Sequence, residues 1–89
     1  MKIKDGVIIN EVDGQYIAVD TGADDKRFNG MLRMNKTACF VAKLLEQETN
    51  LDAIVKAMTE KYEVTAQAAR INAQKVIDTF EDAGLLENI

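Results

Sequence analysis

The sequence predicts a small α+β fold in which a three-stranded antiparallel sheet is followed by three helices. Two observations predict it. Short β-branched runs separated by turn residues fill residues 5–34, and apolar side chains recur about every 3.6 residues from residue 35 onward. A chain of 89 residues accommodates one domain, which we place at residues 1–89. This combination is typical of a winged helix-turn-helix-like domain, although here the strands come before the helices.

A β-hairpin is predicted over residues 7–19. Two strand-like runs flank Asp13 and Gly14, and a type I′ turn needs positive φ at both central residues, which Asp and Gly tolerate. The polar stretch 20–29 is typical of a loop. Residues 30–34 are expected to form a short third strand.

Three helices are expected in the second half, each opened by a side chain that accepts a hydrogen bond from the first turn. Asn35 is the expected cap of the first helix and Thr65 of the third. Thr49, with Asp52 three residues later, resembles a capping box and is the expected cap of the second. Gly84 is expected to end the third helix in the left-handed conformation. The expected inward-facing positions are Thr37, Phe40, Val41, Leu44, Leu45, Leu51, Ile54, Val55, Met58, Tyr62, Ala69, Ala73, Val76, Ile77, Phe80 and Ala83.

Composition argues against several classes of function. The chain has no histidine and one cysteine, Cys39, so it cannot supply a His/Cys zinc site, a Cys–His dyad or a Ser–His–Asp triad. We therefore expect no catalytic residue, no metal and no cofactor, and we expect Cys39 to be a buried thiol in the first helix. A formal charge of −4 disfavours nucleic acid as the main partner.

The sequence also predicts a cytoplasmic protein without a membrane partner. No run approaches the roughly 18 consecutive apolar residues of a transmembrane helix. The first residues carry lysines, but the apolar run that follows is too short for a signal peptide. A lone cysteine fits a reducing compartment.

The third strand and the third helix hold the residues best suited to binding. In an edge strand at residues 30–34, alternation sends Leu32 and Met34 to one face and Met31 and Arg33 to the other. Methionine suits an adaptable apolar groove, although it also fills gaps in cores. One flank of the third helix mixes polar and apolar groups, as the wall of a peptide groove would: Asn72, Lys75, Val76 and Thr79. Ile71 is expected on the opposite, exposed side.

Four motifs follow one another in the second half of the chain. Met34-Asn35-Lys36-Thr37-Ala38 opens the first helix, Thr49 to Val55 the second, Tyr62-Glu63-Val64 leads to the third, and Gly84-Leu85 closes it. In this order they resemble the PqqD-like family of peptide-recognition domains, first associated with pyrroloquinoline quinone biosynthesis.

The resemblance implies a non-catalytic adaptor. Such domains bind the leader segment of a ribosomally made precursor peptide as an added antiparallel strand on the third strand, beside the third helix. They present the peptide to a modifying enzyme, often a radical S-adenosylmethionine protein. The peptide-binding residues implied here are Gly30, Met31, Leu32, Arg33, Met34, Asn72, Lys75, Val76 and Thr79. The net charge of −4 would favour leaders that carry Lys or Arg.

Two other function classes remain alternatives at this point. A winged-helix DNA-binding regulator would need a basic recognition helix, whereas residues 65–83 hold Arg70 and Lys75 against three acids, Asp78, Glu81 and Asp82. A small acid–base enzyme would need paired carboxylates in an apolar pocket, and no such pair is evident. The oligomeric state stays open between a monomer and a dimer through the third strand.

Overall fold

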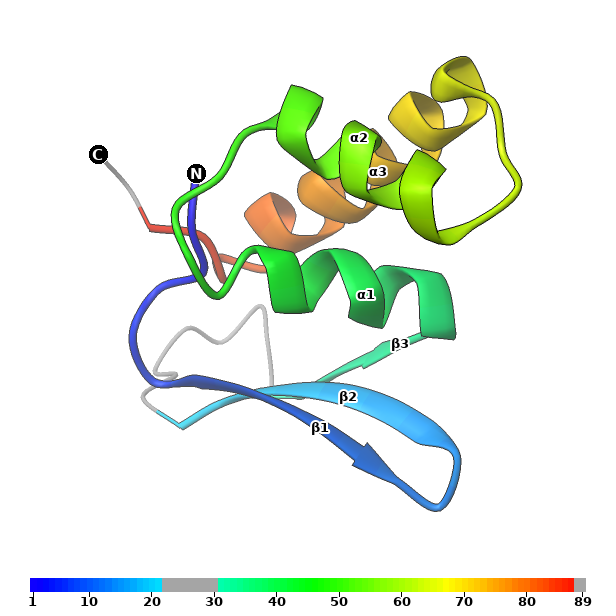
Figure 1. Ribbon diagram of the computed structural model, residues 1–89. Helices are drawn as coiled ribbons and strands as arrows, with labels where there is room; N and C mark the ends of the chain where they lie inside the picture. The colour runs from blue at the N-terminus through cyan, green and yellow to red at the C-terminus, as the bar shows by residue number, and fades with distance from the viewer. Residues whose placement is uncertain (22–30, 88–89) are drawn as a thin grey trace.

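The computed structural model describes residues 1–21 and 31–87. Its elements, in chain order, are β1 (Val7–Val12), β2 (Gln15–Asp20), β3 (Met31–Met34), α1 (Lys36–Leu44), α2 (Leu51–Lys61) and α3 (Ala66–Asp82). The strands form one antiparallel sheet in the order β1-β2-β3, and Figure 1 shows the helices stacked over one face of it. The expected α+β fold is confirmed. Gly30 and most of the expected loop at 20–29 lie outside the described residues.

The β1–β2 hairpin forms as expected. Its turn sets the hydrogen-bonding phase of the sheet, that is, which residues of a strand bond the strand on one side and which bond the strand on the other. Asp13 and Gly14 have φ of 51° and 77°, the positive values of a type I′ turn. At the far end of the hairpin, the Thr21 N–H donates to the Gly6 carbonyl oxygen at 2.9 Å. Antiparallel ladders alternate between bonded and non-bonded pairs, so odd-numbered residues of β2 bond β1. The even-numbered residues turn their backbone groups toward β3.

This phase determines which backbone groups of β3 face away from the sheet. Tyr16 lies opposite Met34, and Ala18 lies opposite Leu32. Leu32 and Met34 therefore direct their N–H and C=O groups to β2. Arg33, between them, directs its N–H and C=O to the open edge, where no strand within residues 1–21 and 31–87 pairs with β3.

The hydrophobic core lies between the sheet and the helices. Phe80, Leu45, Ile54 and Met58 are at most 2% exposed, and Ala18 is the fully buried residue of the sheet. The described residues include no helix long and apolar enough to cross a membrane.

Cys39 and Ile3 are also buried. Cys39 is buried as expected, and burial raises the pKa of its thiol, which keeps the thiol protonated. Ile3, which the sequence analysis did not place in the core, is 4% exposed. Its N–H donates to the Leu45 carbonyl, and it pairs with Leu86 as an isolated bridge.

Two of the three expected helix caps are confirmed and one is wrong. The Asn35 and Thr65 side chains accept hydrogen bonds in the first turns of α1 and α3. The cap of α2 is Asn50 and not Thr49: Asn50 Oδ1 accepts the Ala53 N–H at 2.8 Å. Asparagine is at least as good a cap as threonine, and the Thr49 N–H instead donates to the carbonyl of the N-terminal residue.

Gly84 ends α3 as expected. Its φ is +74°, a conformation that strains residues with a side chain. The Leu85 N–H reaches back to the Phe80 carbonyl at 2.9 Å, the bond of a Schellman motif. Leu85 is thereby turned into the core, where it is fully buried.

The corrected cap of α2 gives a first prediction. Asn50→Ala should lower the free energy of unfolding by about 1 kcal/mol, because the first-turn N–H of Ala53 loses its acceptor. Thr49→Ala is the matched control and should cost less than about 0.5 kcal/mol. Urea unfolding measures both, and a larger loss for Thr49→Ala would contradict the assignment.

The hydrogen-bonding phase of β3 gives a second prediction. Leu32→Pro removes a ladder N–H, whereas Arg33→Pro removes one that faces outward and is tolerated at a sheet edge. We expect Leu32→Pro to lower the free energy of unfolding by about 2 kcal/mol more than Arg33→Pro. Leu32→Ala, which keeps the N–H, measures the share due to the lost side chain. Equal losses of unfolding free energy for the two proline variants would contradict the assignment of the Leu32 N–H to β2 and of the Arg33 N–H to the open edge.

Candidate functional site

A groove runs between the open edge of β3 and the flank of α3. The hollow that includes residues of both β3 and α3, named the main hollow for that reason, has a volume of about 240 Å³ and is lined by Leu32, Arg33, Met34, Asn35, Ala38, Lys75, Val76, Thr79 and Phe80. An adjoining hollow of about 280 Å³ shares Asn35, Ala38, Lys75 and Val76 with it and adds Thr37 and Asn72. Because the two hollows share four lining residues, we treat them as one continuous feature, the β3–α3 groove.

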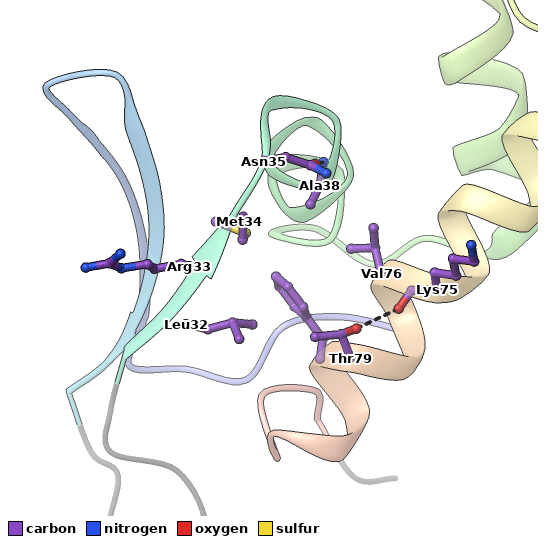
Figure 2. A pocket seen from close by; sticks show the side chains of 9 residues that line it. Leu32, Arg33, Met34, Asn35, Ala38, Lys75, Val76 and Thr79 are labelled. Atoms are coloured by element: carbon purple, nitrogen blue, oxygen red, sulfur yellow. Dashed lines mark hydrogen bonds between the residues drawn. The ribbon is translucent and has the colours of Figure 1, made fainter.

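The sheet side of the groove follows from the alternation of β3. Leu32 and Met34 are half-buried and point toward the helices, whereas the exposed Arg33 side chain points away from them (Figure 2). Phe80, which is 1% exposed, also lines the main hollow. The floor of the groove is therefore apolar, while its rim carries the backbone N–H and C=O of Arg33.

The helix side is built by residues spaced one turn apart on α3. Lys75, Val76 and Thr79 lie on the flank that faces β3 (Figure 2). The Thr79 hydroxyl donates to the Lys75 carbonyl at 2.9 Å, which satisfies its proton within the helix. Asn72, one turn earlier, lines only the adjoining hollow.

The structure brings together most of the residues singled out in the sequence. The main hollow contains Leu32, Arg33, Met34, Lys75, Val76 and Thr79. Met31 belongs to β3 but does not line either hollow. Gly30 lies outside the described residues.

Sequence reasoning missed four residues that line the groove: Asn35, Thr37, Ala38 and Phe80. Phe80 was assigned only to the core, although its place one turn after Val76 and next to Thr79 was a signal that it borders the same flank. Asn35 directly continues β3 and Ala38 lies one turn further on, so the first turn of α1 closes one end of the groove.

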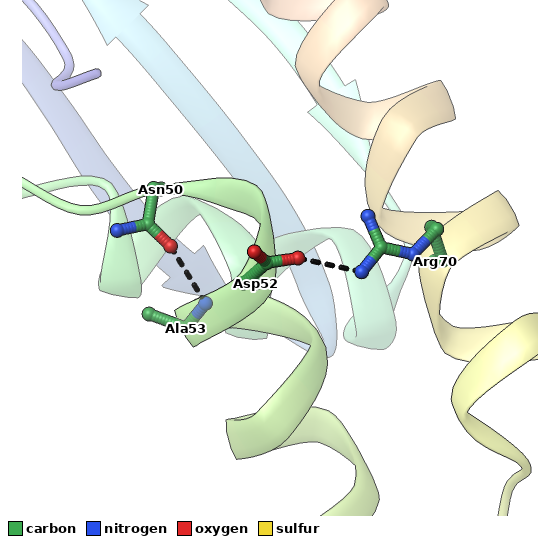
Figure 3. A network of polar contacts seen from close by, with 4 residues as sticks. All are labelled: Asn50, Asp52, Ala53 and Arg70. Atoms are coloured by element: carbon green, nitrogen blue, oxygen red, sulfur yellow. Dashed lines mark hydrogen bonds and ion pairs between the residues drawn. The ribbon is translucent and has the colours of Figure 1, made fainter.

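The charges of the groove are positive. Its two charged lining residues are Arg33 and Lys75, and no carboxylate lines either hollow. Within residues 1–21 and 31–87, neither cation makes an ion pair. Arg70 is different, because its guanidinium contacts the Asp52 carboxylate of α2 at 2.6 Å (Figure 3).

Other hollows lie elsewhere on the surface. One lies beside Leu51 and Ile71, where Ile71 is 52% exposed as expected. Another lies between the hairpin and α1, beside Tyr16, Phe40 and Tyr62. Neither includes a residue of the β3 edge. Among the described residues, no group of three or more acidic or cysteine side chains is arranged to hold a metal ion.

Comparison with known proteins places this geometry in a family. The fold is similar to that of TbiB1, solved in complex with the TbiA(beta) leader peptide, with a TM-score of 0.77 and 20% identity over 100% of this chain and 98% of that one. It is also similar to lasso peptide synthetase B1, complexed with a leader peptide, with a TM-score of 0.72 and 14% identity over 94% and 93% of the two chains. A search of curated proteins found no match. Residues 5–86 match the family described as coenzyme PQQ synthesis protein D, and the chain therefore belongs to the PqqD family.

Proposed function

We propose that this chain is a non-catalytic adaptor that binds the leader segment of a ribosomally made precursor peptide. The observation that carries the proposal is the open edge of β3 beside a groove with an apolar floor. Membership of the PqqD family supports it. The two structural relatives support it as well, because both were solved with leader peptides bound.

The leader would bind by adding a fourth strand to the sheet. The N–H and C=O of Arg33 would pair with the peptide backbone and supply affinity that does not depend on sequence. Alternate side chains of the peptide would enter the groove against Leu32, Met34, Val76 and Phe80. These side-chain contacts would determine which leaders bind.

The adaptor would act together with a second protein. We propose that residues 1–89 work as one recognition domain in the cytoplasm and hand the bound precursor to a modifying enzyme, such as a radical S-adenosylmethionine protein. The catalytic groups would belong to that enzyme. A second copy of the chain would compete for the same edge of β3, so a dimer through this edge and leader binding would exclude each other.

The alternative of a DNA-binding regulator has less support. Of the two cations on α3, Arg70 is paired with Asp52. The C-terminal half of the helix carries Asp78, Glu81 and Asp82, and phosphate binding needs an excess of cations on one face.

Titration with a synthetic leader peptide tests the proposal. A synthetic leader peptide that the protein binds, added to isotope-labelled protein, should shift the NMR signals of residues 31–34 and of the α3 flank at 72–80. Signals near Ile71, on the opposite side of α3, should stay in place. Retardation of duplex DNA at physiological salt, without any response to the leader, would contradict the proposal.

A backbone variant separates strand addition from side-chain contact. Arg33→Pro removes the outward N–H and places a ring carbon where the incoming strand would lie, so leader binding should weaken at least about tenfold. Arg33→Ala is the matched control because it keeps the N–H. Calorimetric titration measures both. Leader binding to Arg33→Pro as tight as to the wild type would show that the peptide does not pair with β3.

A further inference from the structure

We propose that the leader segment bound in the β3–α3 groove is acidic at one defined position: it carries Asp or Glu opposite Arg33, between two apolar residues. The inference rests on the proposed function and adds the chemistry of the ligand to it. It reverses the expectation from the net charge, which favoured leaders that carry Lys or Arg.

The first step concerns where the peptide's side chains would point. In an antiparallel strand paired with β3, the residue opposite Arg33 exchanges backbone hydrogen bonds with it, and both side chains project to the same face of the sheet. That face is the outer one, turned away from the helices. The peptide residues opposite Leu32 and Met34 would project into the groove.

The second step concerns the charge on the outer face. Register and alternation place eight residues of the three strands there: Ile8, Asn10, Val12, Gln15, Ile17, Val19, Met31 and Arg33. Arg33 is the charged member of this set. Its cross-strand neighbour on β2 is Ile17, and the next residue across, on β1, is Asn10. An opposite charge on the added strand would thus be the nearest partner that Arg33 has across the sheet.

The third step concerns the positions on either side. Toward the helices, the floor consists of Leu32, Met34, Val76 and Phe80, which favours apolar side chains in the peptide. Lys75 lies on the wall beside this floor, on the opposite face of the added strand from Arg33. A peptide with an acidic residue between two apolar residues would therefore place its acid beside Arg33 on the outer face and its apolar side chains in the groove.

Local charge outweighs the net charge at this distance. Charges on the surface are screened over about 8 Å at physiological ionic strength. Most of the chain's acids lie outside the groove lining, whereas Arg33 and Lys75 border it. A carboxylate opposite Arg33 in the added strand would lie beside this guanidinium on the outer face of the sheet.

Selection from a random library of displayed peptides tests the inference, with peptides of roughly ten residues so that they extend past both ends of β3. Wild-type protein should enrich Asp or Glu between two apolar residues. Arg33→Glu should enrich Lys or Arg at the same position. Lys56→Glu, on the exposed face of α2, makes the same change in net charge and should select as the wild type does. For an enriched peptide, replacing its acid by Gln should weaken binding roughly two- to fivefold.

The outcomes separate this inference from the function on which it rests. Enriched peptides that lose affinity for Arg33→Pro but show no acid opposite Arg33 would overturn the charge inference and leave the adaptor function standing. A shift to basic residues with Lys56→Glu as large as with Arg33→Glu would overturn the inference as well. Enriched peptides that bind Arg33→Pro normally, or no enrichment at all, would overturn the proposed function itself.

Discussion

The phase of the backbone hydrogen bonds in the β1–β2 hairpin is the constraint on which the rest of the site depends. The type I′ turn at Asp13 and Gly14 fixes which residues of β2 bond β1, and therefore which remain for β3. That choice directs the backbone groups of Arg33 outward and the side chains of Leu32 and Met34 toward the helices. A shift of one residue would exchange the two sets and bury a guanidinium in the groove.

The helices supply the second wall, and their ends determine where it lies. Thr65 starts α3 and Gly84 ends it, so a 17-residue helix passes beside β3 with one flank facing the sheet. The buried stripe of small residues, Ala69 and Ala73, lets α3 pack closely on the rest of the core. Phe80 belongs both to the core and to the groove wall, because it is buried and also lines the groove.

Much of this structure was predictable from local patterns in the sequence. The hairpin, the three helices and the flank of α3 follow from turn residues, caps and the 3.6-residue period, which act over a few neighbouring residues. The cap of α2 was predicted wrongly as Thr49, because Thr49 and Asn50 are adjacent and both residue types can cap a helix. The burial of Ile3 depends on partners more than forty residues away. The two cations of the groove were not foreseen for the same reason: a net charge says nothing about where charges lie, and Arg33 and Lys75 come to line one groove only in the folded chain.

Amide hydrogen exchange at Arg33 tests most directly the claim that β3 accepts a peptide strand. In the free protein the Arg33 amide should exchange quickly, whereas the amides of Leu32 and Met34, bonded to β2, should be protected. Saturation with a bound leader should bring Arg33 to a protection similar to theirs. An Arg33 amide that exchanges as fast with the leader bound as without it would contradict strand addition at this edge.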